Sequence, residues 1–222
     1  MLNVFVGYDD REAVAFHTFN NSLIRHASSP ISITAINDKL CNINRDNGSN
    51  SFTYSRYLIP ELMNYQGWAV FADGDMISTA DIYDLMQYAD YSKAVMVVKH
   101  DYKTKYPRKY LGATNEDYPR KNWSSLVLWN CGHQANKVLT RQYVESATPK
   151  HLHRFEWLYD SLIGELRPSW NWLAMEYSNN CNPKIVHYTV GTPCFPEYAD
   201  CDFSDLWHNE YNLTITPCVN NP

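Results

Sequence analysis

The sequence has no run of apolar residues that approaches the ~18 needed to cross a bilayer as a helix. It also has no excess of basic side chains, since its 222 residues carry 24 acidic and 19 basic ones, a formal net charge of −5. Nucleic acids and anionic membranes attract basic surfaces, so this balance argues against a general binder of either. We therefore expect no membrane span and no nucleic-acid partner.

The six cysteines form neither a C-x-x-C pair nor a zinc-finger spacing. The N-terminal residues go directly into a strand-like pattern, without the charged segment and long apolar segment of a signal peptide. We therefore expect a cytoplasmic protein with free thiols. Disulfides among the four cysteines between residues 181 and 218 are the alternative, which would suit a secreted protein.

Strand and helix signals alternate along the chain, which is typical of an α/β fold. Short apolar segments predict strands at 2–7, 31–36, 68–72, 94–99, 124–129 and 185–188. Helical spacing or helix-start residues predict helices at 11–26, 53–63, 78–88, 135–147 and 155–166. Residues 101–122, which are basic and rich in tyrosine, predict a long functional loop. Since no linker or internal repeat is visible, we expect one domain with an open, mostly parallel sheet flanked by helices.

Two aspartates separated by one glycine, Asp73 and Asp75, follow the apolar strand at 68–72. Alternate side chains of an extended segment project to the same side, so the two carboxylates can converge on one ion. Carboxylate oxygens are good ligands for hard cations, and Gly74 leaves room for a close approach. The sequence therefore predicts a divalent-metal site at the mouth of the sheet.

Five motifs occur in an order that resembles the family 8 glycosyltransferases, which are glycogenin-like and galactosyltransferase-like enzymes with the GT-A fold. They are the strand end Gly7-Tyr8-Asp9, the segment TYSRYLIPEL at 53–62, Asp73-Gly74-Asp75, LRPSWN at 166–171 and IVHY at 185–188. The resemblance covers about residues 1–195. It implies a single GT-A, Rossmann-like domain over residues 1–222, in which residues 1–100 bind nucleotide and metal. Residues 101–222 would then hold the acceptor and sugar and form the C-terminal tail.

The resemblance implies a metal-dependent retaining glycosyltransferase that moves a hexose from a nucleotide sugar to a glycan or another hydroxyl acceptor. UDP-glucose or UDP-galactose is the expected donor. Asp73 and Asp75 would bind Mn²⁺ or Mg²⁺, and His187 would complete the ligand set. A nitrogen ligand favours manganese over calcium. The ion would stabilise the charge that accumulates on the departing diphosphate.

The family's first strand and the turn after it hold the nucleotide, which assigns that role to Gly7, Tyr8 and Asp9. Tyr8 can stack on a pyrimidine, and Asp9 can accept hydrogen bonds from a base or a ribose. The alternative is a simple turn in which an aspartate caps the following helix. Arg56, at the family's Ser-Arg position, would pair with Asp73 or with the donor phosphate. Its alternative is a solvated surface arginine.

The chain departs from the family after His187, where the family's phosphate-binding lysine is missing. Phosphate neutralisation would then fall to Arg56 or to a basic residue of the loop 101–122. The family's strand that touches the sugar corresponds here to a segment in which Ser124 and Ser125 offer hydroxyl groups instead of an amide.

A further departure concerns the family's Asp-Gln-Asp motif, whose place is taken by a segment with Glu156 and Asp160. On the predicted helix the two carboxylates would lie four residues apart on one face. We expect them to contact the reactive face of the sugar, and a solvated face is the alternative.

Two other functions remain open. A haloacid-dehalogenase-type phosphatase also carries Asp-x-Asp after a hydrophobic strand, although usually on its first strand, whereas Asp73 follows the third one here. A non-catalytic nucleotide-sugar or glycan-binding protein of the same fold is suggested by the missing lysine.

Overall fold

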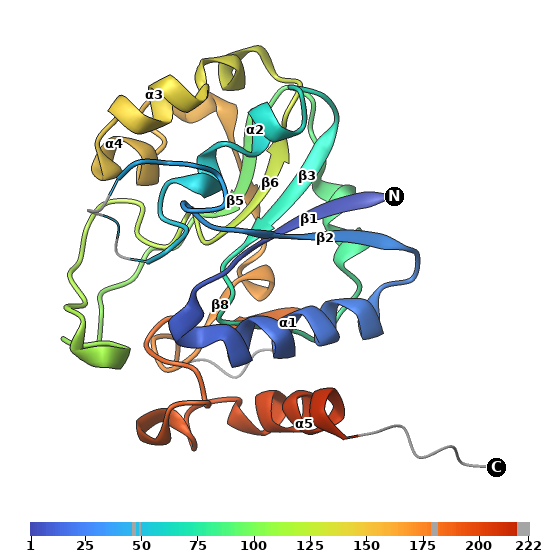
Figure 1. Ribbon diagram of the computed structural model, residues 1–222, viewed down its shortest axis with the longest axis vertical. Helices are drawn as coiled ribbons and strands as arrows, with labels where there is room; N and C mark the ends of the chain where they lie inside the picture. The colour runs from blue at the N-terminus through green and yellow to red at the C-terminus, as the bar shows by residue number, and fades with distance from the viewer. Residues whose placement is uncertain (46–47, 49, 179–181, 217–222) are drawn as a thin grey trace.

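A six-stranded sheet forms the centre of the computed structural model, which describes residues 1–45, 48, 50–178 and 182–216 (Figure 1). Its strand order is β2-β1-β3-β6-β5-β7. The strands are β1 (Leu2–Gly7), β2 (Ile31–Ile36), β3 (Trp68–Ala72), β5 (Val95–Val98), β6 (Leu126–Asn130) and β7 (Ile163–Leu166). Only β6 runs antiparallel to its neighbours, so the sheet is mixed but mostly parallel, as expected.

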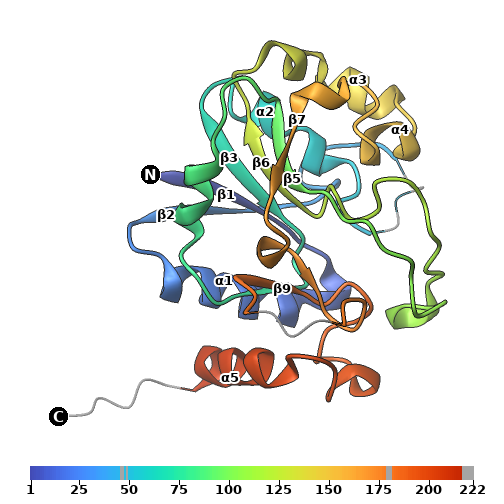
Figure 2. The same ribbon diagram turned by 180° about the vertical axis from the view of Figure 1, so that it is seen from behind.

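Helices cover both faces of this sheet (Figures 1 and 2). They are α1 (Ala13–His26), α2 (Ile59–Leu62), α3 (Arg141–Ser146), α4 (Pro149–His153) and α5 (Ser204–Ile215). Side chains of β1 alternate between the two faces: Val4 and Val6 pack in a core with Phe19 of α1, while Phe5 packs in a second core that includes Leu152 of α4. The fold is therefore the single α/β domain that the alternating pattern predicts.

A second, three-stranded sheet has the order β4-β9-β8, with β4 at Met76–Ser78, β8 at Trp172–Leu173 and β9 at Ile185–His187. Three residues, 73–75, separate the end of β3 from the start of β4, so Asp73 and Asp75 occupy the connection between the two sheets. Because β4 and β9 are antiparallel and Met76 pairs with His187, the histidine is brought beside this connection.

The helix predicted over 155–166 is wrong. Phe155 has a left-handed backbone (φ 53°), and it is followed by a 3-10 turn at Asp160–Leu162 and then by β7, which pairs in parallel with β5. The apolar spacing of this segment suits a helix face, but the pairing of its last four residues with the central sheet determines the structure.

Other predicted helices are shorter than expected. The segments 53–63 and 135–147 each divide into a 3-10 turn, at Ser55–Tyr57 and Gln134–Val138, and a short α-helix. The segment 78–88 contains the 3-10 helix Ile82–Tyr88, which Asp81 caps. Helix α5 has no counterpart among the predicted elements, and in both views it lies on the outer side of α1 (Figures 1 and 2).

The loop at 101–122 is irregular, as expected, and contains only a 3-10 turn at Tyr110–Gly112 and one bridge between Arg108 and Thr114. Within the described residues, no helix is long and apolar enough to cross a membrane. Four of the six cysteines are free thiols, namely Cys41, Cys131, Cys194 and Cys201. Cys181 and Cys218 lie outside the described residues.

Candidate active site

The turn after β3 holds two carboxylates against the end of β1. A Cβ atom on Gly74 would overlap the carbonyl oxygen of Gly7, so only glycine allows the turn to lie this close to β1. Gly74 therefore allows the close approach that the sequence predicts, and the group that approaches it is the backbone of Gly7. This approach fixes Asp73 and Asp75 at the carboxyl end of the sheet.

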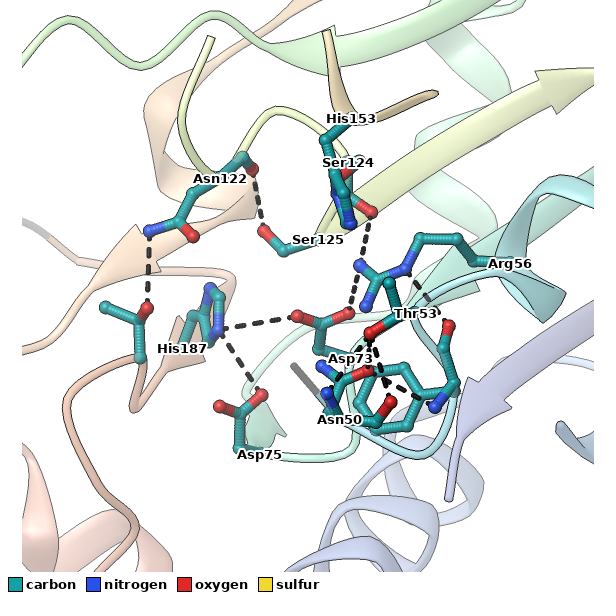
Figure 3. Close-up of polar contacts among 12 residues, drawn as sticks. Asn50, Thr53, Arg56, Asp73, Asp75, Asn122, Ser124, Ser125, His153 and His187 are labelled. Atoms are coloured by element: carbon teal, nitrogen blue, oxygen red, sulfur yellow. Dashed lines mark hydrogen bonds and ion pairs between the residues drawn. The ribbon is translucent and has the colours of Figure 1, made fainter. Parts of the chain in front are cut away.

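Asp73, Asp75 and His187 each offer a ligand atom, and these three atoms lie within 4.8 Å of one another. The Nε2 atom of His187 is 3.3 Å from Oδ1 of Asp75 and 4.0 Å from Oδ2 of Asp73 (Figure 3). Oδ1 of Asp75 is buried and accepts no hydrogen bond from the described residues. An unpartnered carboxylate oxygen beside an imidazole nitrogen is a donor set that fits Mn²⁺ or Mg²⁺.

A chain of hydrogen bonds sets the tautomer of His187. Ser125 donates its hydroxyl to the carbonyl of Asn122 at 2.7 Å, and Asn171 donates its amide nitrogen to Oγ of Ser125 at 2.8 Å. The amide oxygen of Asn171 therefore faces Nδ1 of His187, 3.0 Å away. Nδ1 must carry the proton, so Nε2 presents its lone pair to the two aspartates.

Arg56 is buried, which excludes the solvated alternative. Its Nη1 donates to Oδ1 of Asp73 at 2.8 Å and to the carbonyl of Ser124 at 3.0 Å. The guanidinium lies 5.0 Å from the ring centre of Phe52 and 4.9 Å from that of Phe71. This contact places a fixed positive charge beside the first aspartate.

The two aspartates have different proton affinities. Burial raises the pKa of Asp73, although the neighbouring Arg56 opposes this effect. Burial alone would also raise the pKa of Asp75, but the neighbouring His187 and the positive charge of Lys109 hold that pKa below its usual value. Neighbouring carboxylates with opposite pKa shifts are common at functional sites.

Lys109 is the residue of the basic loop that reaches the aspartates. It lines the same cleft, and its neighbour Tyr110 stacks on Phe195, with ring centres 5.3 Å apart and planes at 24°. The backbone nitrogen of Tyr110 also donates to the carbonyl of Val190 at 2.8 Å. Burial lowers the pKa of Lys109, whereas Asp75 and Asp73 raise it. This lysine comes from a different segment than the family's lysine and offers the same charge.

These groups surround a cleft of about 200 Å³. Its lining includes Arg11, Asn50, Arg56, Asp73, Asp75, Lys109, Asn122, Ser124, Ser125, His153 and His187. His153, at the end of α4, has no counterpart among the predicted site residues. Its Nδ1 is 2.8 Å from the hydroxyl of Ser124 and 3.0 Å from that of Tyr57. Burial, aided by Arg56, lowers the pKa of His153 to about 3, so the imidazole is neutral.

The three residues assigned to the nucleotide do not line this cleft. Gly7 packs against the ring of Phe52, and the ring of Tyr8 meets Phe16 edge-on at 5.0 Å. Asp9 accepts from the backbone nitrogen of Arg11 at 3.0 Å and from its Nη2 at 2.6 Å. Despite its burial, these hydrogen bonds lower the pKa of Asp9 to about 2. Asp9 therefore caps the turn, and its contact with a nucleotide stays a prediction.

Glu156 and Asp160 do not share a helix face, because the predicted helix is absent. Asp160 is exposed and pairs with Arg120 at 2.5 Å, while Glu156 lies 3.4 Å from His151. Neither carboxylate lines the cleft. Their catalytic role stays a prediction that no contact in the structure supports.

Comparisons with known proteins agree with the architecture. No family model matches the sequence. Protein CDI of Arabidopsis thaliana is 43% identical over 219 residues, which cover 93% of this chain and 85% of that protein.

Among solved structures, the WbbM bifunctional glycosyltransferase superposes with a TM-score of 0.69 at 17% identity over 97% of this chain. GlyE of Streptococcus pneumoniae TIGR4 superposes with a TM-score of 0.63 at 16% identity over 95% of this chain. The galactosyltransferase LgtC, in complex with donor and acceptor sugar analogs, gives 0.62 at 12% identity over 97% of each chain. The chain spans 50% of WbbM and 61% of GlyE. These likenesses show the GT-A glycosyltransferase fold.

Proposed function

This chain belongs to the family of Protein CDI of Arabidopsis thaliana, and we propose that it is a metal-dependent glycosyltransferase that uses a nucleotide sugar. The donor is a UDP-linked hexose, glucose or galactose, and the acceptor is a hydroxyl group of a glycan or another molecule. The observation that carries this proposal is the convergence of Asp73, Asp75 and His187 at the end of β3. Three basic side chains, Arg11, Arg56 and Lys109, line the same cleft.

Each group of the cleft has a defined task in this proposal. When bound, Mn²⁺ or Mg²⁺ supplies Lewis-acid stabilisation of the charge that develops on the leaving diphosphate. Asp73, Asp75 and His187 would hold the ion, and the hydrogen bond from Arg56 fixes the position of Asp73. Lys109 adds positive charge where the diphosphate would lie, which is the task of the family's missing lysine.

The sugar would lie toward the start of β6, where two hydroxyl groups line the cleft. Ser124 contacts His153, and Ser125 is part of the hydrogen-bond chain that holds Asn171. The resemblance to family 8 supports retention of the anomeric configuration. A neutral His153 leaves this part of the cleft without added charge, which suits the binding of a hexose.

The test is to titrate UDP into the protein with and without Mn²⁺, and to measure UDP release from UDP-glucose and UDP-galactose. Asp75→Asn should weaken Mn²⁺-dependent UDP binding by about 100-fold or more, since it removes a ligand charge. Asp90→Asn, at an exposed aspartate outside the cleft, is the matched control and should bind UDP normally.

Three results would contradict this function in different ways. UDP binding without release of UDP from either sugar would favour the non-catalytic binding protein. Hydrolysis of a phosphomonoester without any effect of UDP would favour the phosphatase. Equal Mn²⁺-dependent binding by the wild type and Asp75→Asn would exclude the metal site.

A further inference from the structure

A second and larger cavity adjoins the cleft. Its volume is about 540 Å³, and it lies between the loop at 101–122 and the helix α4. Four residues line both cavities, namely Lys109, Thr114, Tyr118 and His153. The second cavity therefore lies next to the place where the sugar of the donor would lie, and its size suits a sugar-sized ligand.

The charge of this cavity is opposite to that of the whole protein. Four basic residues line it, namely Lys109, Lys121, Lys150 and Arg154, against one acidic residue, Glu116. The complete chain has a formal net charge of −5. Basic side chains that gather in one concave surface of an acidic protein favour negatively charged ligands there.

Two of these basic groups lie on α4 or directly after it and have no charged partner. Within the described part of the chain, neither Lys150 nor Arg154 forms an ion pair. Nε of Arg154 is buried without a hydrogen-bond acceptor. A buried guanidinium nitrogen without an acceptor is costly unless a ligand provides one.

Lys121 differs from these two, because it is already hydrogen-bonded. Its Nζ donates to Oδ1 of Asn115 at 2.5 Å and to the carbonyl of Glu116 at 2.9 Å. It also lies 5.8 Å from the ring centre of Tyr118. Lys121 therefore contributes a fixed positive potential, while the half-exposed ring of Tyr118 offers a face on which a sugar can stack.

We propose that this second cavity is the acceptor site and that its acceptor is an anionic sugar, one that carries a phosphate or a carboxylate group. The anion binds Lys150 and Arg154 at the outer end, and the sugar ring extends past Tyr118 toward the cleft. This inference rests on the proposed function, because it names the acceptor of the same reaction.

The experiment measures two affinities on the same protein by calorimetry. UDP with Mn²⁺ is titrated first, and then glucose, glucose 6-phosphate and glucuronate are each titrated into the UDP-loaded protein. Glucose 6-phosphate, glucuronate or both should bind about tenfold or more tightly than glucose, since charge-assisted hydrogen bonds are added. The phosphate and carboxylate arms show which anion the site prefers.

The double variant Lys150→Ala/Arg154→Ala should lose this preference and keep its affinity for UDP. The matched control is Lys137→Ala/Arg167→Ala, which removes two exposed basic side chains outside the cavity and leaves the same net charge. The control should bind the anionic sugar as the wild type does.

Several outcomes would overturn the inference. One is that neither glucose 6-phosphate nor glucuronate binds more tightly than glucose. Another is that the double variant still binds the anionic sugar more tightly than glucose. Competition between the anionic sugar and UDP would assign the cavity to the donor. If UDP and Mn²⁺ fail to bind at all, the proposed function fails. Glucose 6-phosphate that still binds under these conditions would not be bound as an acceptor.

Discussion

In the candidate site, the proton of His187 is held on Nδ1 by a chain of hydrogen bonds through the uncharged side chains of Asn171 and Ser125. Asn171 is fully buried, and its amide is oriented by Ser125 on one side and by His187 on the other. Because an amide can donate only from its nitrogen, the direction of this chain is determined as far as Nε2 of His187. Asn171 therefore determines which nitrogen of His187 would be available to an ion at the proposed metal site.

Asn171→Ala should weaken Mn²⁺ binding by about 10- to 100-fold, because His187 loses the group that fixes its ring and tautomer. The affinity can be measured by titration followed by electron paramagnetic resonance of free Mn²⁺. Asn136→Ala is the control, since Asn136 is equally buried but bonds to the carbonyls of Ala94 and Asn130, away from the site. Equal losses in both variants would show that general destabilisation, and not the orientation of His187, causes the effect.

Some site residues can be read from sequence and others cannot. Asp73 and Asp75 are visible because two carboxylates at the end of an apolar strand are unusual core material. Lys109 and His153 carry no local pattern. They reach the cleft through long-range contacts, the first by the contact of Tyr110 with Val190 and the second by the packing of α4. Such contacts are not visible in the spacing of residues.

The strands β1, β2 and β3 have the predicted bounds. β1 and β3 are almost completely buried, and their short apolar runs between polar segments are typical of buried parallel strands. β2 is a partly exposed edge strand, and its alternation of apolar and polar residues predicts it instead. Helix α5 is missed for the opposite reason. Only Trp207 and Glu210 of this helix are buried, so it has no apolar stripe. Its attachment to α1 includes a polar contact that hydrophobic spacing cannot indicate.

Glu210→Ala should lower the free energy of unfolding by about 1–2 kcal/mol, because it removes a buried carboxylate that accepts two hydrogen bonds from α1. Asn21 donates to it at 2.6 Å and Arg25 at 2.7 Å, and the exposure of Arg25 limits the cost of losing the pair. Urea denaturation measures the change. Glu197→Ala, at an exposed glutamate, should stay within about 0.5 kcal/mol of the wild type. A similar stability of both variants would show that the apolar contacts of Trp207, Leu206 and Tyr211 hold α5 without help from Glu210.

At the scale of the whole molecule, the alternation of strands and helices predicts the α/β class but not the direction of β6. That strand pairs with β3, more than fifty residues earlier, and with β5, and it is antiparallel to both. Its reversal brings the start of β6, with Ser124 and Ser125 just before it, to the carboxyl end of β3, where the backbone nitrogen of Asp73 donates to the carbonyl of Ser125 at 2.8 Å. The site is thus a product of topology, which no single segment specifies.

Two histidines with lowered pKa values, His100 and His153, should make the whole fold sensitive to acid. Burial lowers the pKa of both His100 and His153 to about 3, from an ordinary value near 6.5. The unfolded chain binds a proton on each imidazole below about pH 6.5, whereas the folded chain does not until about pH 3. Stability therefore falls as the pH falls through this window, by up to about 1.4 kcal/mol per pH unit for each histidine.

Side-chain NMR of the eight histidines should show two imidazoles that are still neutral at pH 5. His100→Gln and His153→Gln should each remove one of these two signals, and His26→Gln, at an exposed histidine, is the control that should leave both. Unfolding of the wild type by urea at pH 5, in weak buffer, should take up more protons than unfolding of either buried-site variant, by about one. If every imidazole titrates near pH 6.5 in the folded protein, the two histidines are hydrated, and acid sensitivity in this window must come from other groups.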